Sequence, residues 1–274
     1  MAAWIIPAEA LPLRPALWEA RVGAGRVLLF GDNPAQRTPW RSENIESSVR
    51  ASNVFWTETP HTGSDSAKLF IAKGVDPSRP LASWLTPRDW QRVSAAAASV
   101  GMGVAGLERL RPWLAAILLE QGFNARAGFR PENAPAHVLA AVAEKSGVRV
   151  ASEFADTAAI VDFFAAFSPA AEVGALLRAV GDIEAGAGAS ELAGKAWATG
   201  DQRPELAGVL HLRAAYPAYY QRILVERNRR WRTRIEAMLG NGDNAFVLVG
   251  DYHLVGPDSI QRQLASIGVA TRRI

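Results

Sequence analysis

The chain contains no cysteine, which excludes disulfide bonds and thiolate metal sites but leaves the cellular compartment open. It also lacks any run of the roughly 18 apolar residues that a membrane-spanning helix needs. We expect no intact secretory signal in MAAWIIPAEALPLRP, because no basic segment precedes a long apolar core there, although the remnant of a cleaved signal fits these letters.

Charge of one sign is also scarce, since the formal net charge is only +3. The basic residues are nearly all arginine, and several gather in QRILVERNRRWRTRIEAML. A nucleic-acid-binding protein needs a larger basic face, so we expect no nucleic-acid partner. The segment GMGVAG follows an alanine-rich helix rather than a strand, so we expect no nucleotide cofactor.

Apolar runs bounded by turn residues predict a series of strands. ALWEARV and RVLLF are joined by Gly23, Ala24 and Gly25 and should form a β-hairpin. Further strands are expected in NVFWTE, VRVASE, AFVLVG and the closing VATRRI. Helical periodicity covers residues 43–51, RPWLAAILLEQG, APAHVLAAVAEKSG and most of 156–240. A capping box at Thr86 begins another helix, and Gly147 and Gly240 are expected to end helices.

Strands separated by helices predict an α/β fold, with a central mixed β-sheet flanked by helices and a large helical insertion. We place the helical portion at about residues 80–146. Because no low-complexity linker interrupts the chain, we expect a single domain over residues 15–274, preceded by an N-terminal extension over residues 1–14. The sequence predicts no oligomeric state.

Polar side chains follow four of the predicted strands, and ligands bind beyond the carboxyl ends of strands in open α/β sheets. These side chains belong to Asp32, Glu58, Glu153, and Asp251 together with His253. If the strands are parallel neighbours, the groups meet at one rim, and His61 could reach it. Carboxylates with imidazole suit Mn²⁺, Co²⁺ or Zn²⁺, which would activate a bound water. The alternative is that acidic residues simply end strands and cap helices.

The helix expected around residues 220–239 carries one apolar stripe at helical spacing. The stripe consists of Leu224, Trp231, Ile235, Met238 and Leu239. Asn228 falls within it and Arg227 at its edge, whereas Arg222, Arg229 and Thr233 fall on the opposite, solvated side. Arg227 and Asn228 should therefore point inward and need polar partners, either a ligand or an internal salt bridge.

These segments resemble the successive landmarks of the TraB/GumN family, from about Pro15 to Ile274. The landmarks are PALWEARVGAGRVLLFGD, the glutamates of NVFWTE and VASE, RPWLAAILLEQGF, AWATGD, ERNRRW and FVLVGDYHLVG. The family is related to the TIKI proteins and more distantly to ChaN-like and erythromycin-esterase-like proteins. The resemblance implies an α/β fold with two Gly-x-x-His motifs and a glutamate around one pocket. The TIKI branch implies metal-dependent proteolysis, and bacterial members are often exported, which favours an extracytoplasmic or periplasmic location.

The second motif is complete as Gly250, Asp251, Tyr252 and His253. Where the family has Gly-Thr-x-His, this chain has Gly31-Asp32-Asn33-Pro34, so the first motif lacks its histidine. A second departure is Gly128-Phe129-Arg130, where relatives usually have Gly-Val-Asp.

Three interpretations follow. The first is a metal-dependent, peptidase-like hydrolase with an altered ligand set: Glu58 and His253 would bind the ion, and Asp32 or His61 would replace the absent ligand. Arg227 and Asn228 would then stabilise an oxyanion or hold a substrate carboxylate. The remaining candidate binding residues are Gly31, Asp32, Glu153, Gly250 and Asp251.

The alternative is a catalytically degenerate protein that binds a small molecule or peptide in the former active-site cleft, with Arg130 placing a positive charge where a metal would sit. In the third interpretation the chain is an interaction partner whose rim groups are locked in salt bridges. One histidine with carboxylates binds late transition metals less strongly than two, which moves weight from the hydrolase toward the alternative but leaves the hydrolase as the first interpretation.

Overall fold

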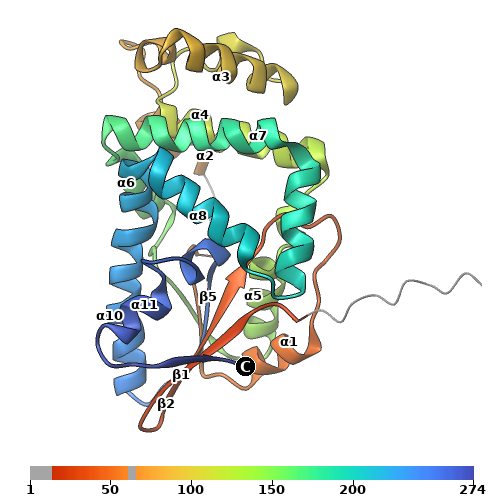
Figure 1. Ribbon diagram of the computed structural model, residues 1–274, viewed down its shortest axis with the longest axis vertical. Coiled ribbons are helices and arrows are strands. Elements are labelled where there is room, and N and C mark those ends of the chain that lie inside the picture. The colour runs from red at the N-terminus through yellow and green to blue at the C-terminus, as the bar shows by residue number, and fades with distance from the viewer. Residues whose placement is uncertain (1–13, 61–65) are drawn as a thin grey trace, which may run out of the picture.

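A six-stranded sheet in the order β4-β3-β5-β2-β1-β6 forms the centre of the protein in its computed structural model (Figure 1). The structure describes residues 14–60 and 66–274, so the expected extension over residues 1–14, apart from Arg14, and His61 lie outside the described residues. The strands are β1 (Leu17–Val22), β2 (Gly25–Asp32), β3 (Val54–Thr57), β4 (Arg149–Ser152), β5 (Asn244–Gly250) and β6 (Thr271–Arg273). β2, β5, β3 and β4 run parallel, whereas β1 is antiparallel to both β2 and β6. The predicted mixed α/β sheet is confirmed.

The hairpin between β1 and β2 forms as predicted, with a shorter turn. Val22 pairs with Gly25, so only Gly23 and Ala24 connect the strands. Gly23 has φ = 55°, a left-handed conformation that a tight two-residue reversal requires and that glycine adopts without strain.

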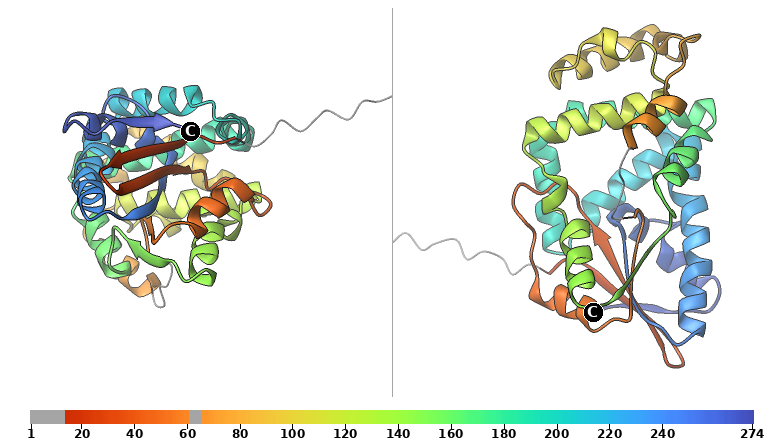
Figure 2. Two further views of the ribbon diagram at one scale, coloured as in Figure 1. Left: turned by 90° about the horizontal axis from the view of Figure 1, so that it is seen from below. Right: turned by 180° about the vertical axis from the view of Figure 1, so that it is seen from behind.

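Helices cover both faces of the sheet, which explains why its central strands are continuous apolar runs. Val27 and Leu29 of β2 pack on one side, toward α10 (Glu226–Gly240) and α11 (Ile260–Ala265). Leu28 and Phe30 pack on the other side, toward α1 (Glu43–Arg50) and α5 (Pro135–Lys145). Figure 2 shows the sheet between these two helical layers.

A third apolar core lies beyond the carboxyl ends of the parallel strands and is purely helical. It is built around α4 (Pro112–Ala127), α6 (Thr157–Ala165), α7 (Pro169–Ala198), α8 (Arg203–Ala215) and α9 (Pro217–Tyr220). In Figure 1, α4 and the first half of α7 cross above the strand ends, and α3 (Pro87–Ser99) lies outermost. The N-cap half of the predicted capping box is confirmed, because the Thr86 side chain accepts from the Asp89 amide, whereas the Asp89 carboxylate accepts from the Thr86 hydroxyl. The short α2 (Ser66–Gly74) lies against α4 and α6.

The long helix α7 connects this helical roof to the sheet. At Gly186 the backbone leaves helical geometry (φ = 79°, ψ = 170°), and α7 then descends toward β2 (Figure 1). Near its end Trp197 donates its ring N–H to the Gly31 carbonyl at 2.9 Å. Among the described residues no single helix is long and apolar enough to cross a membrane; α6 and α7, bent by 107° at their break, pass that test only as a pair, by length and composition.

Two details near α10 and α5 differ from or refine the sequence expectations. Gly147 has φ = 71° after α5, as a helix-ending glycine should, but at α10 the left-handed residue is Gly242 (φ = 76°) rather than Gly240. A π-helical turn, Gln221–Val225, precedes α10. Its larger number of residues per turn changes the helical register, and the Arg222 guanidinium lies half-buried, 4.7 Å from the Phe163 ring centre, instead of in solvent.

Candidate functional site

The ends of the four parallel strands place the predicted polar residues along one edge of the sheet. Because the strand order is β4-β3-β5-β2, Glu153, Glu58, the Asp251–His253 turn and Asp32 follow one another along that edge. The Glu153 amide donates to the Thr57 carbonyl at 2.9 Å, which continues the β3–β4 pairing one residue beyond the strands. The strands thus hold the predicted residues side by side.

Arg227, from α10, is the centre of the cluster at this edge. Its Nη2 donates to Glu58 Oε2 at 2.6 Å and to Glu153 Oε2 at 2.6 Å, and its Nε donates to the same Glu153 oxygen at 3.1 Å. The third nitrogen, Nη1, lies 3.2 Å from His253 Nε2 and 3.5 Å from the Tyr252 hydroxyl. The Arg227 side chain is only 3% exposed. The inward orientation predicted for Arg227 is therefore present, with two carboxylates as partners.

Asn228 contacts His253 on the side of the ring that faces away from Arg227, and both side chains are completely buried. Asn228 Nδ2 donates to the Asp258 carbonyl at 2.8 Å, so its Oδ1 is free to accept from His253 Nδ1 at 2.5 Å. That arrangement places the ring proton on Nδ1 and the lone pair on Nε2, facing Arg227. Burial lowers the pKa of His253 to about 3, because the charge of Arg227 adds to the effect of burial and the charge of Glu58 opposes it only in part. The imidazole is therefore neutral at physiological pH.

Glu58 is a permanent anion in this arrangement. Burial would raise the pKa of its carboxyl, but the charges of Arg227 and the hydrogen bonds it receives hold that pKa at about 2. One of those bonds comes from the Gly250 amide, which donates to Glu58 Oε1 at 2.5 Å. The neighbouring carboxylate, Glu153, also accepts a hydrogen bond at Oε2 from the indole N–H of Trp231 at 3.0 Å.

Asp32 and Asp251 form a separate pair beside this cluster. Asp32 Oδ1 accepts from the Ala136 amide at 3.1 Å and so anchors the start of α5. Burial, with the charges of Glu58 and Asp251, raises the pKa of Asp32 to about 7, and burial raises that of Asp251 to about 6. A Cβ atom on Gly31 would collide with Asp251, whose Cα would be 2.9 Å away. Gly31 therefore permits the close approach of β2 to the turn after β5.

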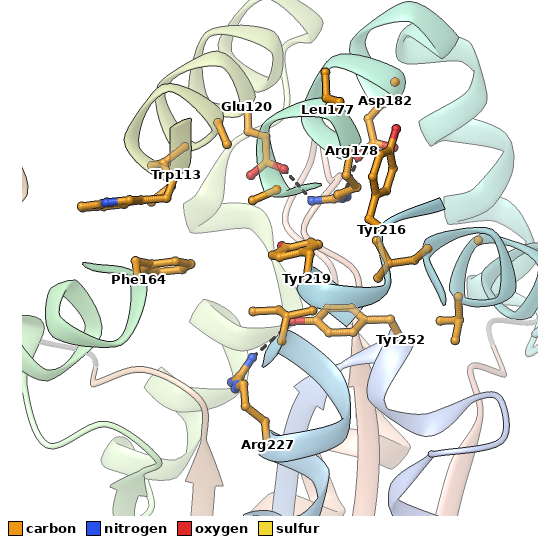
Figure 3. Close-up of a pocket in the computed structure, with 18 of the residues that line it drawn as sticks. Trp113, Glu120, Phe164, Leu177, Arg178, Asp182, Tyr216, Tyr219, Arg227 and Tyr252 are labelled. Carbon is orange, nitrogen blue, oxygen red and sulfur yellow. Dashed lines mark hydrogen bonds and ion pairs between the residues drawn. The ribbon is translucent and has the colours of Figure 1, made fainter. Parts of the chain in front are cut away.

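A cavity of about 560 Å³ separates the strand ends from the helical roof (Figure 3). Its floor includes Arg227, Glu58 and Tyr252, whereas Asn228, His253 and Glu153 lie beneath that floor and do not line the cavity. Sequence reasoning missed Tyr252, although it lies inside the complete second motif.

The roof of the cavity also carries charged residues that sequence reasoning missed. Arg178 of α7 donates from Nη1 to Glu120 Oε1 at 2.5 Å and pairs through Nη2 with Asp182 Oδ2 at 2.6 Å. Glu205 and His211 of α8 line the same space. Helical spacing gave no sign that these residues face the strand ends, since that depends on how the roof is folded over the sheet.

The described residues do not fit the divalent ion that the resemblance implies. His253 Nε2 lies 3.7 Å from Glu58 Oε1, and the guanidinium of Arg227 already contacts both groups. Within residues 14–60 and 66–274, no group of three or more His, Cys, Asp or Glu side chains is placed to hold a metal. Pro34 replaces the first-motif histidine, and His61 lies outside the described residues.

The positive charge expected from Arg130 comes from a different residue. Arg130 is exposed at the start of a short 3-10 turn and does not line the cavity. Arg227 instead supplies the charge between Glu58 and His253.

The model of the TraB/PrgY/gumN family matches residues 16–273, which is nearly the whole chain. No curated protein and no solved structure matches it.

Proposed function

Because the chain belongs to the TraB/PrgY/gumN family but has only one of the two expected motif histidines, we propose that it is a binding protein that takes up a small molecule or a peptide in the cavity above the strand ends. In this proposal the cluster around Arg227 is a structural floor, and the ligand contacts the cavity walls.

The observation that carries this proposal is the position of Arg227. Its guanidinium satisfies Glu58 and Glu153 and also contacts the only lone pair that neutral His253 offers. A buried charge is tolerated when it is paired and hydrogen-bonded, and here every member of the group has a partner. A metal or a substrate anion would have to break these contacts before it could reach Glu58 or His253.

The cavity itself supports ligand binding. Ligand sites commonly occupy about 300–1,000 Å³ and combine apolar walls with a few polar groups. This cavity, at about 560 Å³, has aromatic walls that include Trp113, Phe163 and Phe164, and a small number of charged side chains.

Two glycines in the cavity wall allow a direct test. A Cβ atom added at Gly208 or Gly181 meets nothing within 4 Å, and both residues line the cavity, so we expect the larger side chains of Gly208→Trp and Gly181→Trp to occupy cavity space. Gly188 is equally unobstructed but lies outside the cavity lining, which makes Gly188→Trp the matched control.

We expect amphiphilic small molecules or short peptides to raise the unfolding temperature of the wild type and of Gly188→Trp, but not of the two cavity-filling variants. Equal stabilisation of all four proteins would place the ligand elsewhere and contradict the proposal. No stabilisation of any of them by any probe would remove its basis.

A second candidate is the metal-dependent, peptidase-like hydrolase with an altered ligand set. It is favoured by the short distance of 3.7 Å between His253 Nε2 and Glu58 Oε1, where Glu58 lines the cavity floor and His253 lies directly beneath it. Peptide turnover restored by Mn²⁺ or Co²⁺, and lost in both Glu58→Gln and His253→Ala, would support this candidate. The absence of turnover under these conditions would favour the binding protein.

A further inference from the structure

The cavity that we propose as the ligand site has an excess of negative charge. Within residues 14–60 and 66–274, its lining contains four carboxylates but only two guanidiniums, those of Arg178 and Arg227. The carboxylates are those of Glu58, Glu120, Asp182 and Glu205. Among the described lining residues, carboxyl groups therefore outnumber guanidinium groups by two.

Neither guanidinium is available to an incoming anion. Arg227 uses its nitrogens on Glu58, Glu153, Tyr252 and His253. Arg178 joins Glu120 and Asp182 through its two terminal nitrogens. A carboxylate or phosphate entering the cavity would therefore meet neutralised cations and additional anions, which disfavours its binding.

Glu205 is the carboxylate that most needs a partner. Among the described residues it forms no ion pair or hydrogen bond, and it lies half-buried on α8. Burial, with a contribution from Asp251, raises the pKa of Glu205 to about 7. The charge of Arg178 lowers the pKa of Glu205 and the charge of Asp182 raises it, so the Glu205 carboxyl lies close enough to these two roof residues to interact with their charges.

The rest of the lining suits the apolar body of a cationic ligand. Trp113 and Phe164 stack with ring centres 5.8 Å apart and form one wall, while Tyr219 lies between the roof and the floor residue Tyr252 (Figure 3). Aromatic faces attract organic cations within about 6 Å of the ring centre. The neighbouring Phe163 already serves an internal cation in this way, since Arg222 lies 4.7 Å from its centre.

We propose, on the basis of the cavity-binding function above, that the ligand is an organic cation in which an ammonium or guanidinium group is attached to an apolar body. Its charged end binds beside Glu205 and Asp182, and its apolar body lies against Trp113 and Phe164. A free amine and a basic side chain of a peptide share this chemistry.

Three probes with similar shape but different charge test the effect of charge alone. They are 4-phenylbutylamine, 4-phenylbutanol and 4-phenylbutyrate, and their binding is measured by calorimetry at pH 8. We expect the amine to bind at least about tenfold more tightly than the alcohol, because a charge-assisted hydrogen bond is roughly twice as strong as a neutral one. The butyrate should bind most weakly. A Lys-Phe dipeptide amide and its Gln-Phe counterpart distinguish a peptide source from a free amine.

Three substitutions locate the charged end. Glu205→Gln should weaken amine binding about tenfold and leave alcohol binding unchanged. Glu191→Gln, at an exposed acid of α7 that pairs with Arg37 outside the cavity lining, should change neither. Arg178→Gln frees Glu120 and Asp182 and should strengthen amine binding, whereas an anion-binding site would respond in the opposite direction.

Tighter binding of the butyrate than of the amine, or an equal loss of amine and alcohol binding in Glu205→Gln, would overturn the cation proposal and leave the cavity function intact. If none of the probes shows binding that Gly208→Trp abolishes, both the cation proposal and the proposed function fail.

Discussion

The floor and the roof of the cavity use the same chemical unit, an arginine between two carboxylates, in two different environments. In the floor, Arg227 is 3% exposed and joins Glu58 and Glu153. In the roof, Arg178 is 41% exposed and joins Glu120 and Asp182. Water screens the charges of the roof group but not those of the floor group. The roof ion pairs should therefore contribute little to the stability of the fold, whereas the floor ion pairs are required for it. This difference separates the part of the site that supports the fold from the part that can receive a ligand.

The largest expected effect is the removal of the floor arginine. Arg227→Met leaves Glu58 and Glu153 as buried, uncompensated anions and should lower the free energy of unfolding by about 3–5 kcal/mol, measured by urea denaturation. The matched change in the roof, Arg178→Met, should cost about 1 kcal/mol or less, because its carboxylates remain hydrated. Equal losses would mean that burial does not distinguish the two groups.

The glycines of the two regions should also differ, with a somewhat smaller effect. Gly31→Ala forces a Cβ atom against Asp251, where it meets backbone as well as side chain, and should lower the free energy of unfolding by about 1–3 kcal/mol. Gly181→Ala in the roof meets open space within α7 and should raise it by up to about 1 kcal/mol through helix propensity. A tolerated Gly31→Ala would show that β2 and the turn after β5 can separate freely.

The contributions of the floor and roof carboxylates to the free energy of unfolding should change with pH in opposite directions. The pKa of Glu205 is raised from 4.5 to about 7, so the folded state keeps a proton that the unfolded state has lost between these values. The wild type therefore loses stability as pH rises through this window. Glu205→Gln should be more stable than wild type by about 1 kcal/mol at pH 8, after allowance for solvent screening, and equally stable at pH 4.

The charged groups that act on Glu205 are Asp251 on the turn after β5, and Arg178 and Asp182 on α7, while His211 on the same helix also lines the cavity. Glu58 gives the opposite comparison, because its pKa is lowered from 4.5 to about 2. Its charged form stabilises the protein above pH 4.5, and this stabilisation disappears as the pH falls toward 2. Glu58→Gln should thus be less stable than wild type at pH 8, and a gain of stability there would contradict the assignment.

The sequence predicted the floor much better than the roof, for a physical reason. Strand-end residues are predictable because parallel strands place their carboxyl ends at one edge, and the runs VLLF and FVLV predicted strands that pair in parallel in the structure. The inward direction of Arg227 and Asn228 followed from the 3.6-residue period of their helix. These inferences required only local periodicity and one topological rule.

The roof depends on tertiary packing that local patterns do not record. Glu120 lies in a helix that is apolar on nearly all sides, so its direction could not be read from the sequence. Arg178 faces the strand ends only because α7 crosses above them before it bends at Gly186. The π-helical turn before α10 likewise moved Arg222 away from its expected solvated position.

The smallest expected effect is that of metal ions. If Arg227 already satisfies Glu58 and His253, Mn²⁺, Co²⁺ or Zn²⁺ gains little by binding there, since it must displace a paired guanidinium from both groups. Protein purified without chelator or affinity metal should then contain far less than one equivalent of metal, and EDTA should leave its unfolding temperature unchanged. A ligand at one hundred times its dissociation constant stabilises a protein by about 2.7 kcal/mol, so tight binding would be easily detected. One equivalent of bound metal that is lost in His253→Ala would mean that Arg227 moves away from Glu58 and His253. The floor residues would then form a metal-dependent reaction centre rather than a structural support.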